Sequence, residues 1–374
     1  MAKTRISKAP ISLWGNLLRA RWLQSLFVVL VALACLSVGT SQAGPIQWVT
    51  VGDPGNAADT RSGANTFGRG AVASSFQIMK YEFTNQQYTD FLISVAATDP
   101  YELYNPLMGS NIRGGITQSG VSGSYRYTVR QDMGDKPVNY VSWFDAARVA
   151  NWYQNGATSS SSTETGAYTL LNGQTSGNAV AVNSDASYFI PTQDQWYKAA
   201  YFAPNYGGAG VGGAGVPGYW VYATQSGTNA LDVNTQPTAV TAGSTGIGSA
   251  GDLGNSANWN NAAGWNGATG NVTTVGTNGG PSFYETFDMS GNVYEWNDLN
   301  GLAGSGRQGR GGFWSNTLPI YLSSSIAVPY SPSEENVGLG FRLAAVPEPS
   351  TWAMGLAGLA CGALQAVRRR RRAR

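Results

Sequence analysis

The residue types that most often carry enzyme chemistry are scarce in this sequence. Its 374 residues include no His and two Cys. Without His, the chain has no imidazole for acid–base catalysis, for a Ser-His-Asp triad, or for His-ligated zinc, iron or haem. Two Cys cannot form a four-cysteine zinc site or an iron–sulfur cluster within the chain. The groups that could still form a site are carboxylates, amides and aromatic rings.

Acid pairs and tryptophans are the remaining candidates. Asp132 and Asp135 are close in sequence, but a glycosidase needs two carboxylates opposed across a cleft, and any acidic chain contains pairs by chance. Three tryptophans fall on expected helices and are predicted to belong to the core: Trp143, Trp152 and Trp196. Others fall in loops or at strand ends, where binding sites are common, and are better candidates for ligand contact: Trp220, Trp259, Trp265 and Trp314.

The two ends of the chain are basic and non-globular. Residues 1–43 combine five basic residues and no acid with an apolar run at 26–36 and a small-residue site at 41–43. This order predicts a secretory signal peptide, with an uncleaved anchor as the alternative. At the other end, an apolar stretch at 352–367 precedes six arginines. A membrane stop with its Arg cluster in the cytoplasm explains that order better than nucleic-acid binding does.

Setting these ends aside reverses the charge of the chain. The whole sequence has a formal net charge of +2, but residues 44–346 carry 12 basic and 20 acidic residues, a net charge of −8. A negative body would repel nucleic acid, so nucleic-acid binding is not expected. The same negative charge favours the binding of cations. Cys35 and Cys361 fall in the end segments, so the body has neither a thiol nor a disulfide. A body of about 300 residues can bury enough core to do without one.

The body predicts three capped helices and short strands. Helices are expected at 85–97, 143–154 and 193–201. Capping-box patterns precede the first and the third, Thr84 with Gln87 and Thr192 with Gln195, and Ser142 caps the second, with Asp145 at N3. Strands are expected at 46–51, 76–83, 137–141, 310–314 and 339–343. Residues 203–280 are rich in Gly, Asn, Ser and Thr and predict long loops, which are usually functional, pinned by metal or disordered. The tryptophans within them argue against disorder.

Six phrases in a fixed order resemble the formylglycine-generating-enzyme (sulfatase-modifying-factor) family. They are FQIMKYEFTNQQYTDFL, PVNYVSWFDAARVANWY, YFIPTQDQWYKAAYF, DMSGNVYEW, GRGGFWS and GFRLA, and they span residues 74–344. The resemblance implies an α+β fold, a variant of the C-type-lectin fold with little regular secondary structure. It also implies one domain at 44–345, where length alone suggests about two.

The same resemblance bears on catalysis. Active family members oxidise a substrate cysteine with a copper ion held by two cysteines, the first just after a pair of glycines and the second five positions on. Counted from Gly311 and Gly312, these positions are Asn316 and Tyr321, and neither side chain forms the thiolate that Cu(I) requires. A second branch of the superfamily uses His-ligated iron, and this chain has no His. We therefore expect no copper site, and Asn316 and Tyr321 join Trp314 and Trp265 as candidates for ligand contact.

A structural role for calcium is also implied by the resemblance. The first site would use two acidic side chains and two backbone carbonyls: Asp288, Glu295, Gly291 and Val293. Such hard oxygen ligands suit Ca²⁺. The second site would use the Asn258 side chain and the Trp259 carbonyl, with further ligands within 266–272. The alternative is that Asp288 and Glu295 are ordinary loop acids held by hydrogen bonds.

Residues 346–374 resemble a PEP-CTERM sorting signal. Val346-Pro347-Glu348-Pro349-Ser350, the apolar stretch and the terminal arginines stand in the order of that signal, although an ordinary single-pass anchor is the alternative. The resemblance implies a bacterial protein exported across the membrane, held there transiently by its C-terminal helix and processed by an exosortase-type protease. The destination would be the cell surface or the extracellular matrix.

Two functions remain open at this point. The missing Cys and His chemistry, combined with the sorting tail, favours a non-catalytic binding or structural protein whose partner is an extracellular polysaccharide or a surface protein. The alternative is a divergent oxidoreductase of the formylglycine-generating type, acting on a protein or a small molecule.

Overall fold

The computed structural model describes residues 45–347 apart from 64, 207–216, 225–234 and 305. The chain divides into two units, Met1–Gln42 and Ala43–Arg374, and the first lies outside the described residues. The predicted signal peptide and the C-terminal apolar stretch also fall outside them. Within the described ranges, no helix has both the length and the apolar character needed to cross a bilayer.

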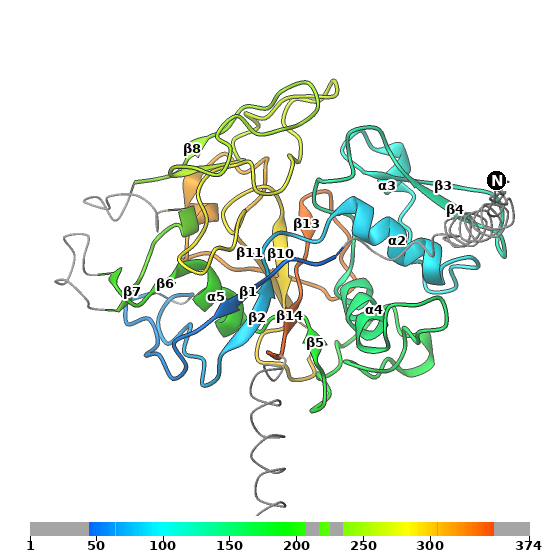
Figure 1. Cartoon of the computed structure of the whole chain (residues 1–374), viewed down its shortest axis with the longest axis horizontal. Helices are drawn as coiled ribbons and strands as arrows, with labels where there is room; N and C mark the ends of the chain where they lie inside the picture. Colours follow the sequence, from blue (N-terminus) through cyan, green and yellow to red (C-terminus); the bar gives the residue numbers. More distant parts are fainter. Residues whose placement is uncertain (1–44, 64, 207–216, 225–234, 305, 348–374) are drawn as a thin grey trace, which may run out of the picture. The chain divides into compact units, whose positions relative to one another are not determined.

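A four-stranded sheet joins the two ends of the domain. Its order is β1-β2-β14-β5, with every neighbouring pair antiparallel. The strands are β1 (Trp48–Val51), β2 (Phe76–Met79), β14 (Ala344–Ala345) and β5 (Tyr188–Phe189). In the register, Ala345 lies opposite both Gln77 and Tyr188. The last strand of the domain is therefore held between β2 and β5, near the centre of Figure 1.

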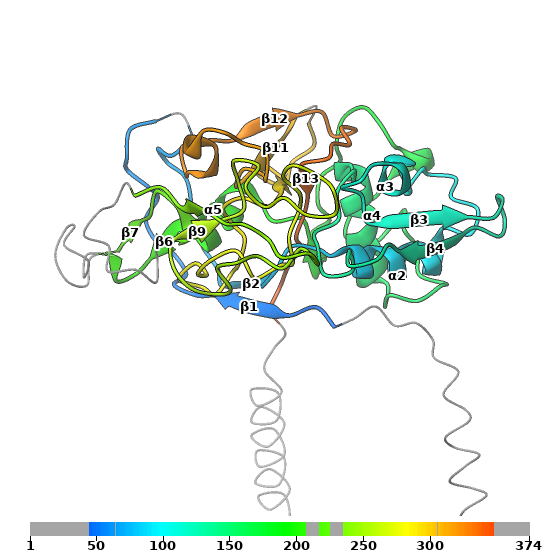
Figure 2. The same ribbon diagram turned by 90° about the horizontal axis from the view of Figure 1, so that it is seen from above.

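A second four-stranded sheet contains the GNVYEW phrase. Its order is β12-β11-β10-β13, and β10 pairs in parallel with β13 and antiparallel with β11. The strands are β10 (Tyr294–Asn297), β11 (Arg307–Arg310), β12 (Val328–Tyr330) and β13 (Leu339–Gly340). All four residues of β10 are buried, as expected of a central strand covered on both faces. Figure 2 shows β11 and β12 on the side of the domain away from β1.

The three predicted helices are confirmed, and each begins with a capping box. They are α2 (Asn85–Val95), α4 (Trp143–Gln154) and α5 (Gln193–Tyr201). In each box the N-cap hydroxyl accepts from the N3 backbone N–H, and the N3 side chain accepts from the N-cap N–H. These bonds satisfy backbone donors that the first helical turn leaves free. A one-turn helix, α3 (Leu107–Ser110), and two 3₁₀ segments, η1 (Leu171–Gly173) and η4 (Pro319–Leu322), complete the helical elements described.

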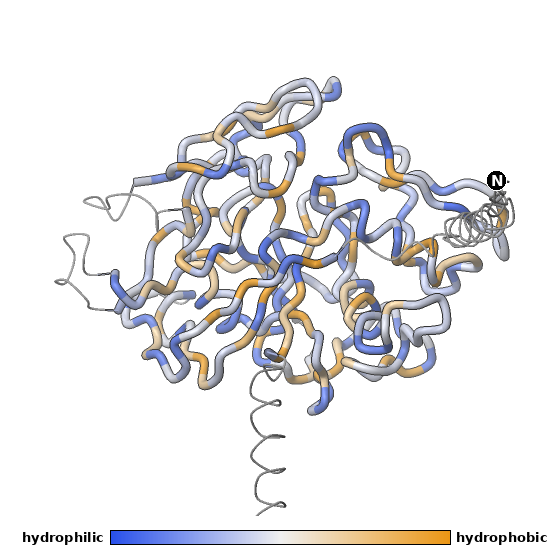
Figure 3. Tube along the Cα trace, viewed as in Figure 1, coloured by the Kyte–Doolittle hydropathy of each residue, from blue (hydrophilic) through white to orange (hydrophobic). Residues whose placement is uncertain are grey.

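The main core lies between α2, α4 and the two sheets, and a second cluster packs α5 against β1 and β2. Trp143, Trp152 and Trp196 are at most 1% exposed, which confirms their predicted place in the core. Figure 3 shows hydrophobic residues concentrated along α4 and the central strands, while the loops near β8 are mostly pale or polar. The fold is α+β with short elements and long loops, as the resemblance implied.

Short two-stranded sheets pin several of the loops. They pair β3 (Ile116–Ser119) with β4 (Arg126–Val129), β6 (Phe202–Ala203) with β7 (Gly218–Tyr219), and β8 (Thr238–Ala239) with β9 (Ser256–Ala257). The loop region of residues 235–280 is thus held by the two-residue strands β8 and β9 and by buried side chains, and not by long strands.

Four strand predictions were wrong in position or length. The strand expected at 76–83 ends at Met79. Residues 137–141 form an isolated bridge between Pro137 and Thr84 instead of a strand. The strand expected at 310–314 ends at Arg310, because Gly311 and Gly312 turn the chain with φ of 95° and 80°, in the left-handed region that glycine tolerates. The stretch 339–343 is divided between β13, which ends at Gly340, and β14, which begins at Ala344 in the other sheet.

Candidate functional site

Asn316 and Tyr321 follow the paired glycines, and the backbone at Tyr321 approaches Gly312 closely. A Cβ added to Gly312 would lie 3.0 Å from the Tyr321 carbonyl oxygen, so the glycine lets the two segments meet. The Asn316 Oδ1 accepts from the Phe313 N–H at 2.7 Å, and the Asn316 N–H donates to the Phe313 carbonyl at 3.0 Å. The buried Asn316 side chain therefore holds this turn closed. Tyr321 is part of η4 and is 36% exposed.

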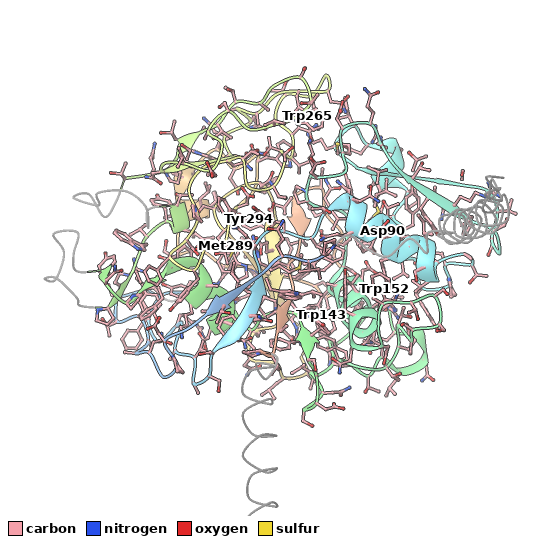
Figure 4. All side chains as sticks on the ribbon, in the orientation of Figure 1. Asp90, Trp143, Trp152, Trp265, Met289 and Tyr294 are labelled. Atoms are coloured by element: carbon pink, nitrogen blue, oxygen red, sulfur yellow. The ribbon has the colours of Figure 1, made fainter. Side chains whose placement is uncertain are left out.

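Aromatic rings form a wall beside Asn316. The Tyr294 hydroxyl bonds to the Asn316 side chain, and its ring centroid lies 5.5 Å from Phe313 and 6.2 Å from Tyr330. Burial, followed by the nearby Tyr330, raises the pKa of Tyr294 above its ordinary value, so this hydroxyl stays protonated and can donate or accept a hydrogen bond. Figure 4 shows Tyr294 near the centre of the domain. Sequence reasoning missed Tyr294, although the alternation of side chains along a strand would place it on the face of the sheet opposite to Glu295.

Exposed apolar side chains continue the surface beyond this wall. Leu318 is 56% exposed and Ile320 is 49% exposed, next to Tyr321 in the same short segment. We call Leu318, Ile320 and Tyr321 the η4 patch. Clustered exposed apolar residues are a feature of interaction surfaces more often than of inert ones. The patch includes Tyr321, one of the two positions where the resemblance places cysteines, and begins two residues after Asn316, which is the other.

Glu295 and Arg342 form an ion pair in the interior. Both side chains are fully buried, and Arg342 donates from Nε and Nη2 to the two carboxylate oxygens at 2.5 and 2.6 Å. Burial opposes the charged guanidinium, but Glu295 and the neighbouring acids outweigh it and raise the pKa of Arg342. Trp196 also donates to Glu295, at 2.9 Å. Glu295 therefore links the GNVYEW strand, the GFR phrase and α5, and Arg342 has a structural role at this junction.

Asp288 and Glu82 add two more buried carboxylates near this pair. Asp288 accepts from the Gly276 N–H at 2.6 Å and from the Asn278 amide at 2.8 Å. Glu82, missed by sequence reasoning, accepts from the Asn292 amide at 2.7 Å and from the Val293 N–H at 3.2 Å. Burial and the other carboxylates raise the pKa of Glu82, and burial raises that of Asp288. A Ca²⁺ ion at Asp288 and Glu295 would have to share both acids with these donors, so this site stays a prediction.

The second predicted calcium site centres on a buried amide cluster. The Asn258 Nδ2 donates to the Asn271 carbonyl, the Thr273 hydroxyl and the Asn292 Oδ1, at 2.8–3.1 Å. Its Oδ1 is buried and finds no hydrogen-bond partner. An orphaned oxygen of this kind fits a hard cation, which would satisfy it.

The Trp259 carbonyl, the other predicted ligand at this site, already accepts from the Ala262 N–H at 3.2 Å and keeps a second lone pair. The structure brings Asn271 and Thr273 to Asn258, where both contact the Nδ2 and not the unpartnered Oδ1. In the part of the chain that the structure describes, no three His, Cys, Asp or Glu side chains are grouped so that they could hold a metal ion. A cation at this second site would therefore depend on amide and carbonyl oxygens.

The loop tryptophans are buried, not exposed. Trp220, Trp259, Trp265 and Trp314 are 4–6% exposed. Trp265, labelled among the upper loops in Figure 4, donates to the Val272 carbonyl at 2.7 Å and lies beneath the Lys136 ammonium. The Arg113 guanidinium covers the Trp314 ring at 4.4 Å. Their contact with a ligand remains a prediction, and the rings pin the loops that surround the amide cluster. Asp132 and Asp135 are exposed.

Comparison with protein families gives two matches. Residues 48–346 match the sulfatase-modifying factor enzyme 1-like domain, and residues 345–372 match the PEP-CTERM protein-sorting motif. The two matches share Ala345 and Val346. Comparison with curated proteins gives no match.

Solved structures similar to this chain include three with low sequence identity. Treponema denticola variable protein 1 is 20% identical, with a TM-score of 0.47 over 81% of this chain and 95% of its own. CarF is also 20% identical, with a TM-score of 0.41 over 81% of this chain and 99% of its own. PvdO from Pseudomonas aeruginosa is 16% identical, with a TM-score of 0.35 over 81% and 92%.

Proposed function

Because this chain belongs to the sulfatase-modifying factor enzyme 1-like family and carries a PEP-CTERM sorting motif, we propose that it is an exported protein whose domain binds a ligand without catalysing a reaction. The sorting motif supports export and processing at the C-terminus by an exosortase-type protease. After transient anchorage through the C-terminal segment, the domain would reach the cell surface or the extracellular matrix.

The observation that carries this proposal is the role of Asn316. Its side chain closes the turn after the paired glycines through the Phe313 N–H, and its backbone carbonyl accepts from the Asn260 N–H at 2.9 Å. An amide used in this way supplies neither a thiolate nor a proton-transfer group. With Tyr321 at the second position, the site offers an aromatic and apolar surface in place of a soft metal ligand.

The η4 patch is the binding surface that we propose. It combines apolar side chains with the Tyr321 phenol, and rings with a polar tip are common where proteins bind sugars or other proteins. The partner would be an extracellular polysaccharide or a surface protein. Calcium is part of the proposal: bound at Asn258 and Trp259, it would join the loop ahead of GNVYEW to the rest of the domain and offset part of the negative charge of the body.

The test is a binding screen with matched variants. Purified full chain is applied to immobilised glycans, to isolated bacterial exopolysaccharide and to cell-surface protein fractions, with Ca²⁺ present. We expect binding to at least one of them that is lost in Tyr321→Ala and Ile320→Ser. Leu253→Ser is the control, because Leu253 is 74% exposed and lies outside the patch. Binding to none of these probes, or equal binding by all variants, would contradict the proposal.

A further inference from the structure

A groove of about 520 Å³ lies on the first sheet and is separate from the η4 patch. The patch belongs to the segment between β11 and β12, and Figure 2 shows β1 on the side of the domain away from those strands. The groove volume falls within the range of about 300–1,000 Å³ that is usual for small-ligand pockets. The groove is therefore a second place at which the domain could hold a ligand.

The register of the sheet places the side chains of the groove on one face. Ala345 on β14 lies directly opposite Gln77 on β2 and Tyr188 on β5, and directly paired side chains share a face. Thr50 on β1 pairs with Gln77, and Trp48 shares the face of Thr50 because side chains alternate along a strand. Ala345 has only a methyl group between the longer side chains of its two partners, which leaves room above the sheet. All four strands of the sheet thus contribute to the groove.

Two partly exposed aromatic rings belong to the groove. The Trp48 and Tyr188 ring centroids are 5.9 Å apart, and the ring of Tyr153 on α4 lies 5.8 Å from that of Tyr188. Trp48 also packs against the main core. Rings held in this way lose little conformational freedom when a ligand covers them, which favours binding.

Four polar side-chain groups in the groove are free to bind a ligand. Within the described residues, these groups make no hydrogen bond to the protein: the Trp48 indole N–H, the Gln77 amide, the Ser187 hydroxyl and the Tyr188 hydroxyl. The backbone of Ser187 is already paired, because its N–H donates to the Gln154 side chain at 2.7 Å and its carbonyl accepts from the Val346 N–H at 2.9 Å. The indole only donates, whereas the amide and the hydroxyls both donate and accept. None of the residues that line the groove is charged.

A neutral sugar ring matches both features of this groove. Its C–H faces are apolar and pack on aromatic rings, while the hydroxyls at its rim both donate and accept hydrogen bonds. A carboxylate ligand only accepts, and it brings a charge that the lining does not pair. The net charge of −8 on residues 44–346 further disfavours an anion.

A proline-rich peptide is the other ligand common in grooves lined by aromatic rings. Prolines carry no N–H, so such a segment offers carbonyl acceptors and few donors. It would leave the Gln77 side-chain oxygen without a donor, whereas the hydroxyls of a sugar supply one. The polar groups of the groove therefore favour the sugar.

We propose that this groove binds a neutral pyranose unit of a saccharide, with the sugar ring against Trp48 and Tyr188 and its hydroxyls bonded to Gln77 and Ser187. The site stands whether or not the η4 patch binds a ligand. Where both sites reach the same polysaccharide at once, the domain holds that chain more tightly than either site does alone.

Saturation-transfer NMR on the purified full chain tests the proposal with matched pairs of sugars. The probes are the methyl glycosides of glucose, galactose and mannose, each paired with the methyl glycoside of its uronic acid, and a polyproline peptide. We expect at least one neutral glycoside to bind. Its uronic acid should bind at least about five-fold more weakly, because the carboxylate loses a donor and carries an unpaired charge. The polyproline peptide should not bind.

Variants of the groove locate the binding site of the glycoside. Trp48→Ala removes the larger ring and should weaken binding at least about ten-fold. Gln77→Leu keeps the bulk of the side chain and removes the amide, so it should weaken binding even where Trp48→Ala fails to fold. Phe67→Ala is the control, because Phe67 is an exposed ring outside the groove, and it should leave binding unchanged.

Several results would overturn the proposal. They are binding of no neutral glycoside, binding of the uronic acids or of the polyproline peptide that is as tight or tighter, and unchanged binding in both groove variants. Loss of glycoside binding in Tyr321→Ala but not in the groove variants would assign the sugar to the η4 patch instead. Conversely, glycoside binding that depends on Trp48, in a chain whose η4 variants bind every partner as the original does, would contradict the proposed function of the patch and support the groove.

Discussion

Replacing Arg342 by Met should be among the most damaging single substitutions in this domain. The guanidinium bonds both oxygens of Glu295 and also donates to the carbonyls of Met79, Lys80 and Phe287, at 2.7–3.2 Å. Breaking a fully buried ion pair by removing one partner costs about 3–5 kcal/mol, because the remaining charge stays buried and unpaired. The three carbonyls lose a donor as well. Against a total stability of about 5–15 kcal/mol, this loss is a large fraction.

Equilibrium unfolding of the full chain in urea measures the effect. We expect Arg342→Met to lower the free energy of unfolding by about 3–5 kcal/mol and the melting temperature by about 6–10 °C, taking about 2 °C per kcal/mol for a domain of this size. Glu295→Gln keeps an oxygen that accepts from the Trp196 indole. The double variant Arg342→Met/Glu295→Gln should therefore be less destabilised than the sum of the two single variants, by about 1.5 kcal/mol or more.

Two results would refute this reasoning. If Arg342→Met lowers the free energy of unfolding by less than about 1 kcal/mol, the pair contributes no more than a solvent-exposed salt bridge does. Strict additivity in the double variant would show that the two side chains contribute separately. Lys80→Met is the matched control, because Lys80 is partly exposed and its Nζ is 4.0 Å from an exposed Glu285, so its loss should stay within about 0.5 kcal/mol.

Three further predictions test other parts of the structure. Burial and the nearby Glu335 raise the pKa of Asp145 to about 8, so its contribution to stability is full below its unfolded pKa near 3.8 and is lost as the pH rises through about 8. Asp145→Asn should therefore reduce the fall in unfolding free energy between pH 5 and pH 9 by at least about 1.4 kcal/mol. An unchanged pH profile would count against this. EDTA should lower the melting temperature of the full chain and Asp288→Ala should lower it too, with Asn258→Ala removing much of the EDTA effect; a melting temperature indifferent to EDTA contradicts the calcium proposal. Gly312→Ala should lower the free energy of unfolding by more than about 1 kcal/mol, because φ is 80° and the added Cβ would lie 3.0 Å from the Tyr321 carbonyl oxygen. Gly306→Ala is the control: no atom lies within 4 Å of its added Cβ, so it should be near neutral in the same urea titration.

Local signals in the sequence were sufficient for the helices but not for most strands. Each helix carries its own start signal, as Thr192 and Gln195 show, and enough turns for its apolar face to repeat. Strands of two residues, such as Leu339–Gly340, are too short for any alternation to register, and their partners are distant in sequence. Gly311 and Gly312 were identified as a motif, but the sequence did not show that they end a strand.

The candidate site was only partly predictable for a similar reason. The spacing after the paired glycines located Asn316 and Tyr321, because a motif fixes positions along the chain. The pairing of Glu295 with Arg342, 47 residues apart, requires the meeting of two sheets. The approach of Asn271 to Asn258 depends on loops held by buried tryptophans, which no local pattern encodes.

An aldehyde assay on the unmodified full chain tests whether the domain lacks formylglycine-generating activity. The protein is incubated with copper, oxygen, a thiol reductant and a Cys-containing sulfatase peptide, and mass spectrometry follows conversion of the peptide cysteine to formylglycine. Because Asn316 and Tyr321 provide no thiolate, we expect no conversion above a copper-only control. Conversion that depends on the protein would contradict this expectation and establish the divergent oxidoreductase instead.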